Sequence, residues 1–201
     1  MKNLLFPGWA SFRKFYEKEL IEEFIYDDFS YESSKEINVI AWSMGTLKAL
    51  EYIKNHKINK LIFLAPTSNF TKTTSRELVD NMIEGIKTNK IETLNNFYRL
   101  NFSKNSDYAN FIEEYKSEIE NLIEAELIEG LEFLRDKTVI DYSFENVKEI
   151  YVITGKRDKV INSENTKEFI SIGKHTEFNL GHNFIYGNKV LYDLVRSILS
   201  D

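Results

Sequence analysis

The fold of this chain is decided by the stretch INVIAWSMG at residues 37–45. Its apolar first half precedes Ser43, and a helix-like stretch at residues 46–56 follows. This order predicts a strand, a tight turn and a helix with the serine at the apex, an arrangement called a nucleophile elbow. The backbone at such a serine is strained, and small residues two positions away, here Ala41 and Gly45, let the strand and the helix approach closely. The usual pattern is G-x-S-x-G, so Ala41 replaces the first glycine.

An acid and a histidine follow this serine at two later strand ends. Asp158 comes after a predicted strand at residues 148–154, and His182 comes after a strand-like run at residues 176–180. The chain order Ser43, Asp158, His182 is that of the α/β-hydrolase fold. In that chemistry the histidine takes the serine proton, and the aspartate holds the imidazole in the correct tautomer. The pattern predicts a catalytic triad.

Each member of this triad also has a purely structural interpretation. Ser43 could be a structural serine, Asp158 a turn residue that caps the next helix, and His182 an ordinary surface residue. The two other histidines, His56 and His175, are flanked by polar residues and are expected at the surface. The coincidence of three suitable residues in the correct order favours the catalytic interpretation.

The N-terminal segment predicts the remaining part of such a site. A short apolar strand at residues 3–6 leads into Pro7-Gly8-Trp9. Acyl transfer develops negative charge on a carbonyl oxygen, which two preorganised N–H donors stabilise. We expect the backbone amides of Trp9 and Met44 to form this oxyanion hole, with Gly8 allowing the backbone to approach a substrate closely. The alternative is an ordinary Pro-Gly turn at the end of a strand.

The composition limits the other possibilities. The chain has 201 residues, a net charge of −6 and 42% hydrophobic residues, which suits one globular domain and a monomer. It has no cysteine, which fits a cytoplasmic location and excludes thiolate sites. The acidic balance argues against nucleic-acid binding, and no apolar run suits a signal peptide or a membrane helix. The three histidines lack metal-binding spacing, so we expect neither metal nor cofactor.

Predicted strands and helices alternate through the first third of the chain. The strands are expected at residues 3–6, 24–29, 37–42 and 61–65, and the helices at residues 12–23 and 46–56. With the two strands before Asp158 and His182, the pattern predicts a minimal α/β-hydrolase fold: a mostly parallel sheet of about six strands flanked by helices. Because ligands bind beyond the carboxyl ends of parallel strands, the triad would meet at that edge.

The middle of the chain interrupts this alternation. Apolar residues recur at helical spacing over residues 77–86, 90–101 and 111–134. We therefore expect a helical cap at residues 68–138, inserted into a core made of residues 1–67 and 139–201. Most aromatic side chains of the cap should pack it onto the core. The candidates for facing the active site are Phe97, Tyr98, Phe102 and Phe111.

Charge is distributed unevenly along this cap. Residues 68–104 carry six basic and four acidic residues, whereas residues 105–140 carry three basic and ten acidic residues. Two solvated helix faces would explain this pattern. The alternative is a basic surface in the first half that binds an acidic partner.

Five segments carry a resemblance to a known family. They are FPGWA at residues 6–10, WSMG at 42–45, GLEFL at 130–134, GKRDKV at 155–160 and GHNF at 181–184. Together they resemble the pimeloyl-[acyl-carrier protein] methyl ester esterases of biotin synthesis, over nearly the whole chain. Many esterases share the hydrolase motifs, whereas the tryptophan pair and the Gly-Leu-Glu run are more specific to this family.

The resemblance implies hydrolysis of the methyl ester at the far end of a pimeloyl chain carried on acyl-carrier protein. Ser43 would attack that ester, and Trp9 and Trp42 would line the apolar channel for the acyl chain together with Phe97, Phe102 and Phe111. The acidic carrier protein would be the partner. It would bind basic cap residues, which map to Arg76, Lys87, Lys90, Arg99 and Lys104.

Two alternatives remain open at the level of sequence. A broad short-chain carboxylesterase or thioesterase would use the same triad, because the oxyanion chemistry is the same. A non-catalytic protein with this fold would only bind a partner, and the complete set of Ser43, Asp158 and His182 argues against it.

Overall fold

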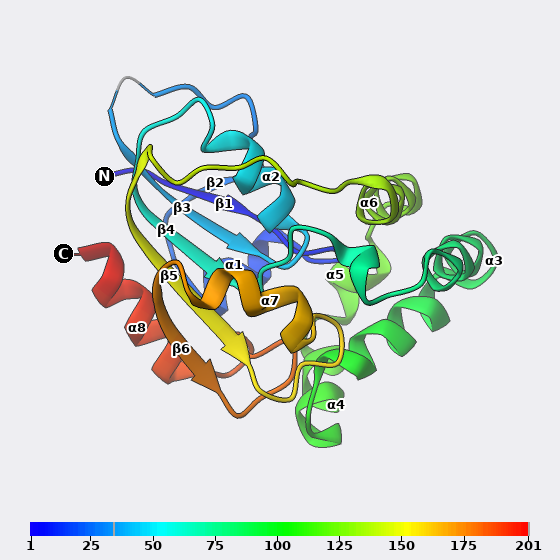
Figure 1. The fold of residues 1–201 in the computed structure, drawn as a ribbon. Coiled ribbons are helices and arrows are strands. Elements are labelled where there is room, and N and C mark those ends of the chain that lie inside the picture. Colours follow the sequence, from blue (N-terminus) through cyan, green and yellow to red (C-terminus); the bar gives the residue numbers. More distant parts are fainter. Residues whose placement is uncertain (34, 201) are drawn as a thin grey trace.

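Figure 1 shows the computed structural model of the chain, which describes residues 1–33 and 35–200. Over these residues, six strands form one parallel sheet in the order β2-β1-β3-β4-β5-β6. The strands are β1 (Asn3–Phe6), β2 (Ile25–Tyr26), β3 (Ile37–Trp42), β4 (Ile58–Leu64), β5 (Val147–Gly155) and β6 (Lys174–Phe178). The predicted sheet is confirmed, with all of its strand pairs parallel.

Helices cover both faces of this sheet. They are α1 (Arg13–Glu19), α2 (Gly45–Tyr52), α7 (Ser163–Ile170) and α8 (Lys189–Ser200). In Figure 1, α2 and α7 lie on one face and α1 and α8 on the other. The chain runs outward from β1 to β2, and then returns to the other side of β1 with β3. A right-handed crossover puts its helix on one face of the sheet when the chain moves one way along the sheet, and on the opposite face when the chain moves the other way. The β1–β3 boundary is therefore the point of the sheet where ligands bind in open α/β folds.

The central strands are buried on both faces. Every residue of β3 is buried, and Leu61–Leu64 of β4 have no exposed surface. This double burial explains why these strands read as continuous apolar runs rather than as alternating patterns. Lys60 is a buried exception in β4, and its ammonium group donates a hydrogen bond to the carbonyl oxygen of Ile198 near the end of α8. A cation at that position complements the negative end of the helix.

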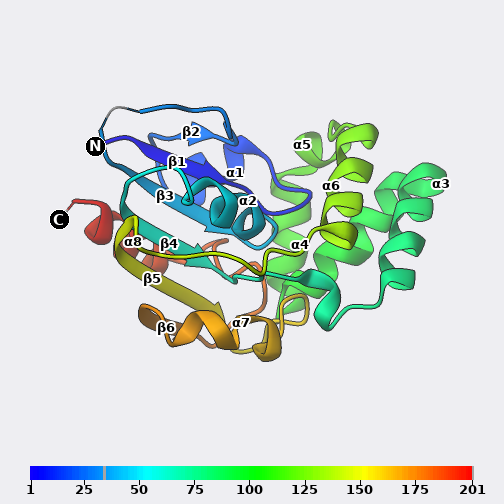
Figure 2. The same cartoon turned by 45° about the horizontal axis from the view of Figure 1, so that its top comes forward.

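The segment between β4 and β5 forms a separate group of helices. These are the short helix η1 (Phe70–Lys72) and the helices α3 (Arg76–Asn101), α4 (Asn105–Glu114), α5 (Lys116–Glu120) and α6 (Glu124–Asp136). Figure 2 shows α3 to α6 together beyond the carboxyl ends of the strands. The ends of the segment meet at an antiparallel bridge between Asn69 and Thr138, where the Val139 N–H donates to the Ser68 carbonyl oxygen at 2.9 Å. We call residues 68–138 the cap.

The helices of the cap differ in part from the prediction. The two helices expected at residues 77–86 and 90–101 are confirmed, because α3 consists of two helical segments divided at Asn89, whose backbone is not helical (φ −152°, ψ 76°). The single helical stretch expected over residues 111–134 is wrong, because Tyr115 and Ile123 leave helical geometry and divide it.

Some element ends also differ from the prediction. The strand expected over residues 24–29 is limited to β2, since Asp27 adopts a left-handed backbone with φ 48°. The final strand begins at Lys174, earlier than the predicted start at residue 176. The helix α1 ends at Glu19, not at residue 23. None of the helices in the described ranges is long and apolar enough to cross a membrane.

Candidate active site

Ser43 lies at the sharp turn between β3 and α2. Its backbone is left-handed with φ 53°, which is a strained conformation for a residue with a side chain. Its N–H donates to the Leu64 carbonyl oxygen, and its own carbonyl oxygen accepts the Thr46 N–H, both at 2.9 Å. A methyl group at Gly45 would lie 2.1 Å from the carbonyl oxygen of Phe6 in β1. Only glycine therefore allows α2 to pass so close to the sheet, as the motif predicted.

The structure brings the three predicted triad residues together. Nε2 of His182 lies 3.0 Å from Oγ of Ser43, and Nδ1 of His182 lies 2.7 Å from Oδ2 of Asp158. The other carboxylate oxygen of Asp158 accepts the backbone N–H groups of Val160 and Ile161, each at 2.8 Å. The side chains of His182 and Asp158 are only 2% and 3% exposed. With one oxygen held by the turn, the other is aimed at the imidazole.

The histidine is also fixed by its surroundings. The ring of Trp42 stacks on the His182 ring, with centroids 5.4 Å apart and planes inclined by 27°. The next residue, Asn183, donates its N–H to the carbonyl oxygen of Asn101 at 2.9 Å. A methyl group at Gly181 would lie 2.5 Å from that same oxygen. The end of the cap helix α3 therefore packs directly on the loop that carries the histidine.

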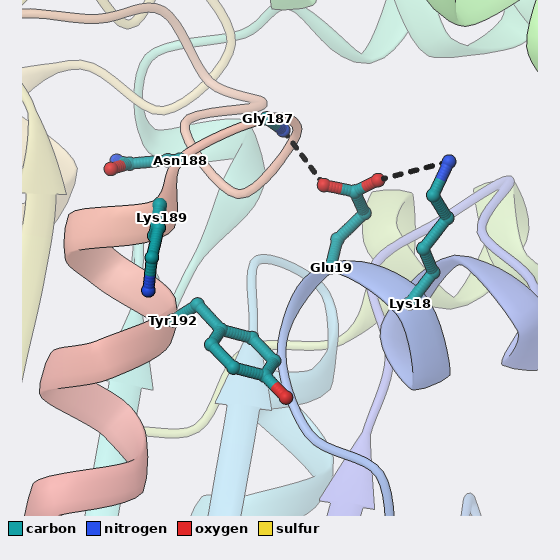
Figure 3. Close-up of a pocket in the computed structure, with 6 residues that line it drawn as sticks. All are labelled: Lys18, Glu19, Gly187, Asn188, Lys189 and Tyr192. Atoms are coloured by element: carbon teal, nitrogen blue, oxygen red, sulfur yellow. Dashed lines mark hydrogen bonds and ion pairs between the residues drawn. The ribbon is translucent and has the colours of Figure 1, made fainter.

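A second anchor holds the far end of this loop (Figure 3). One carboxylate oxygen of Glu19, in α1, accepts the Gly187 N–H at 2.8 Å. The other oxygen accepts a hydrogen bond from the Tyr115 hydroxyl of the cap at 3.2 Å and lies 3.9 Å from the ammonium group of Lys18. Lys18, Glu19 and Gly187 border a cavity of about 320 Å³, which Lys189 also lines. No sequence pattern points to Glu19, because its hydrogen-bond partners Tyr115 and Gly187 are 96 and 168 residues away.

The two predicted oxyanion donors come from the segments that follow two paired strands. Trp9 lies after β1, and Met44, the residue after Ser43, is the N-cap residue of α2 and lies after β3. In the described part of the chain, neither of their backbone amides donates to a protein acceptor. The preceding amide, that of Gly8, is already bonded to the hydroxyl of Tyr16 at 3.0 Å. Among the described residues, the amides of Trp9 and Met44 therefore have no protein acceptor, as an oxyanion hole requires.

The indole ring of Trp9 joins the core to the cap. Its N–H donates to the carbonyl oxygen of Leu127 in α6 at 2.8 Å, and its ring meets that of Phe97 edge-on at 4.6 Å. A methyl group at Gly130 would lie 2.7 Å from Cδ1 of Trp9. This contact gives the Gly-Leu-Glu segment of the sequence a structural role, because glycine there lets α6 rest on the tryptophan.

An aromatic crevice lies between core and cap beside the triad. Among the predicted substrate-contacting residues, it is lined by Trp9, Trp42, Phe97, Tyr98 and Phe111. Phe102 is not in the lining. Its ring packs instead against those of Phe111 and Tyr186, at 5.3 and 5.9 Å. The crevice is nearly closed, with a volume of about 10 Å³.

Most of the basic residues predicted to bind a carrier protein are engaged within the cap. Arg76 pairs with Asp136, Lys87 lies 3.5 Å from Glu84, Lys90 donates to the carbonyl oxygens of Glu120 and Leu122, and Arg99 lies over the ring of Tyr108. Lys104 precedes α4 as its N-cap residue. The acidic partners of Arg76 and Lys87 offset the charge that these two residues would present to an acidic surface.

A second cavity, of about 520 Å³, reaches the nucleophile turn at Met44. It lies between α2 and α6, and its lining is mainly acidic. The charged lining residues are Asp27, Lys48, Glu126, Glu129 and Glu132. Lys48 is paired with Asp27 at 2.7 Å, so the three glutamates of α6 dominate the charge of this cavity. The described residues contain no group of three or more His, Asp or Glu side chains placed to hold a metal ion.

Comparison with known proteins shows the fold. No protein-family model matches the chain, and no curated protein matches it. Among solved structures, it is similar to an esterase from Exiguobacterium antarcticum, with a TM-score of 0.81 and 18% identity over 100% of this chain and 92% of that one. The enzyme MGS-M2 from a Medee basin deep-sea metagenome library, described as an alpha/beta hydrolase, gives a TM-score of 0.73 and 13% identity over 100% and 89%. BioG from Haemophilus influenzae gives 0.69 and 17% over 100% and 94%. The chain has the α/β-hydrolase fold.

Proposed function

We propose that this protein hydrolyses carboxylic esters through an acyl-enzyme intermediate. The observation that carries the proposal is the buried hydrogen-bonded series from Ser43 through His182 to Asp158, with distances of 3.0 and 2.7 Å. Side chains with these roles and this geometry form the catalytic triad of serine hydrolases on several unrelated folds. The strained backbone at Ser43 supports the proposal, because strain of this kind collects at functional sites.

The proposed reaction follows from this geometry. As the Ser43 hydroxyl attacks the ester carbonyl carbon, its proton passes to Nε2 of His182, and negative charge develops on the carbonyl oxygen. The amides of Trp9 and Met44 would stabilise that charge. Collapse of the tetrahedral intermediate expels the alcohol, which takes the proton from Nε2. Water then attacks the acyl-serine with the same proton transfers and releases the acid and free Ser43.

For the substrate, we propose the methyl ester of a pimeloyl chain on acyl-carrier protein. This rests on the resemblance of the five sequence segments described above, and the similarity in fold to BioG is compatible with it. The aromatic crevice between Trp9 and Phe111 would suit an apolar acyl chain. In this role the protein would act on an acidic partner in the cytoplasm.

A broad carboxylesterase is the second candidate, and two observations favour it. Four of the five basic residues assigned to the carrier protein already have partners inside the cap. The cavity that reaches Met44 is lined by glutamates, which would repel an acidic carrier. A small neutral ester would meet neither difficulty.

One experiment tests both levels of the proposal. Hydrolysis of methyl pimeloyl-carrier protein and of a small p-nitrophenyl ester would be measured with the wild type and with Ser43→Ala. Loss of both activities in Ser43→Ala is expected, and undiminished turnover would overturn the mechanism. Efficient cleavage of the carrier substrate, weakening as salt is raised, supports the carrier assignment. Cleavage of the small ester alone would leave the esterase proposal intact and reject the carrier substrate.

A further inference from the structure

The indole N–H of Trp42 is buried without a hydrogen-bond acceptor. Trp42 is 5% exposed, and its Nε1 is one of two buried side-chain N or O atoms without a partner in residues 1–33 and 35–200; the other is Oγ1 of Thr46. Almost all buried polar groups in proteins are paired, and leaving one unpaired is costly. The packing of the ring alone therefore does not explain why a tryptophan, with its polar N–H, occupies this position.

The orientation of this indole is fixed on two sides. A methyl group at Gly8 would lie 2.8 Å from Cε3 of Trp42, so the benzene edge of the ring rests against the backbone there. One face of the ring stacks on His182. In an indole, the N–H lies on the edge opposite to Cε3. The N–H therefore points away from Gly8 and has no room to turn toward it.

Trp42 belongs to the buried core and also borders the aromatic crevice. The ring lines the aromatic crevice together with Trp9, Phe97 and Phe111, and Asn183, the residue after the histidine, is among the other lining residues. The other crevice tryptophan, Trp9, has its N–H bonded to Leu127 at 2.8 Å. Of the two indole donors, that of Trp42 is thus the one left for a ligand, and Trp42 directly precedes Ser43.

We propose that the Trp42 N–H binds a hydrogen-bond acceptor in the substrate. This rests on the proposed esterase function and narrows the substrate class. The acyl group would be mainly apolar, to suit the aromatic lining, and would carry a carbonyl or ether oxygen a few bonds from the ester that Ser43 attacks. Since the crevice holds about 10 Å³, the cap aromatics Phe97 and Phe111 must move apart when this group enters. A purely hydrocarbon chain would leave the N–H unpaired.

A series of matched esters tests the proposal. The substrates are p-nitrophenyl heptanoate and four analogues in which one ether oxygen replaces the methylene at C3, C4, C5 or C6. For each analogue, kcat/KM is divided by that of heptanoate and corrected for the relative rates of alkaline hydrolysis. We expect the wild type to prefer the oxygen at one position by about tenfold, the effect of one hydrogen bond of ordinary strength. In Trp42→Phe, which keeps an aromatic ring but lacks the N–H, that preference should disappear.

Phe111→Leu is the matched control, because this residue lines the same crevice without a donor. It should change kcat/KM for all the esters by a common factor and keep the preference. A wild-type series without any preferred position would overturn the proposal, and so would a preference that survives in Trp42→Phe. If Trp42→Phe does not fold, a wild-type series without a preferred position still overturns the proposal, and a preferred position supports it. Failure of the proposed function would be seen differently, as the absence of Ser43-dependent hydrolysis of every ester.

Discussion

The carbonyl oxygen of Asn101, the last residue of α3, accepts the backbone N–H of Asn183 at 2.9 Å. This bond connects residues 82 positions apart in the chain and joins the second segment of α3 to the loop that carries His182. The position of the proposed general base therefore depends on the cap as well as on the sheet. A change at this junction should affect catalysis without any contact with the substrate.

Gly181→Ala tests this dependence. Its added methyl group would lie 2.5 Å from the Asn101 carbonyl oxygen. Because that oxygen belongs to the backbone of α3 and the methyl group is attached directly to the loop backbone, no side chain can move aside, and the loop itself must shift. We expect kcat to fall by about tenfold or more, since small displacements of catalytic groups are costly. The free energy of unfolding should fall by about 1–3 kcal/mol, as in other overpacked sites. Ester hydrolysis and urea unfolding measure the two effects.

Gly187→Ala is the control for this loop. Gly187 has a left-handed backbone with φ 64°, but a methyl group there meets no atom within 4 Å. The variant should lose about 1 kcal/mol of stability through backbone strain and keep most of its kcat. Equal loss of kcat in both variants would show that any strain in the loop, rather than the contact with Asn101, is responsible.

Asp158→Asn should abolish the proposed ester hydrolysis through the tautomer of His182. The carboxylate oxygen that accepts the Val160 and Ile161 N–H groups must remain an acceptor, so the amide oxygen of asparagine takes that place. The amide NH₂ then faces Nδ1 of His182, which must become the acceptor, and Nε2 carries the proton. Nε2 can no longer accept the proton of Ser43, and kcat should fall by about four orders of magnitude. Steady-state hydrolysis with the thermal unfolding curve as a folding control measures this, and a loss below tenfold would contradict the assigned role.

Tyr16→Phe should weaken the predicted oxyanion hole from a distance. The Tyr16 hydroxyl accepts the N–H of Gly8 at 3.0 Å, immediately before the Trp9 amide. Phenylalanine leaves that buried N–H unpaired, at a cost of about 1–3 kcal/mol in stability. It also frees the loop, so that kcat should fall by about tenfold while KM changes less. The nearby Tyr26→Phe is the control, since the Tyr26 hydroxyl contacts Ser11 at 3.4 Å and not Gly8; equal losses of kcat in both variants would reject this mechanism.

The triad and the sheet were predictable because each follows from a local pattern. The apolar run before Ser43 indicates a buried strand, Gly45 is required by the approach of α2 to Phe6, and the order of the three triad residues belongs to one fold. Parallel pairing then brings distant strand ends to a common edge. Each of these inferences depends on residues of the core, so none of them requires the structure of the cap.

The cap was less predictable because long-range contacts decide it. The break in the helix expected over residues 111–134 is stabilised by Lys90, whose ammonium group binds two carbonyl oxygens near the end of α5. Phe102 packs against the ring of Tyr186, a residue of the loop that carries His182, and does not line the crevice. Apolar periodicity predicts that such segments are helical, but it does not tell which partner covers each face.

Several tyrosines make the folded state sensitive to alkali. Burial raises the pKa of Tyr16 and Tyr98 well above the ordinary value of 10.0, and raises the pKa of Tyr142 to about 12. In the unfolded chain these hydroxyls ionise near pH 10. Their contribution to stability is therefore complete below pH 10, and it is lost as the pH rises above 10 toward the folded-state values, because only the unfolded state releases protons there.

Tyr98→Phe is the variant that isolates this effect. The Tyr98 hydroxyl donates to the Ala10 carbonyl oxygen, so the variant should be less stable than the wild type at pH 7–9, where the two stability curves run parallel. Above pH 10 its stability should fall less steeply, by up to about 1.4 kcal/mol per pH unit, since one fewer proton is released on unfolding. Urea unfolding at half-unit steps from pH 7 to 11.5 measures the slopes. Equal slopes above pH 10 would show that Tyr98 ionises as readily in the folded protein as in the unfolded chain.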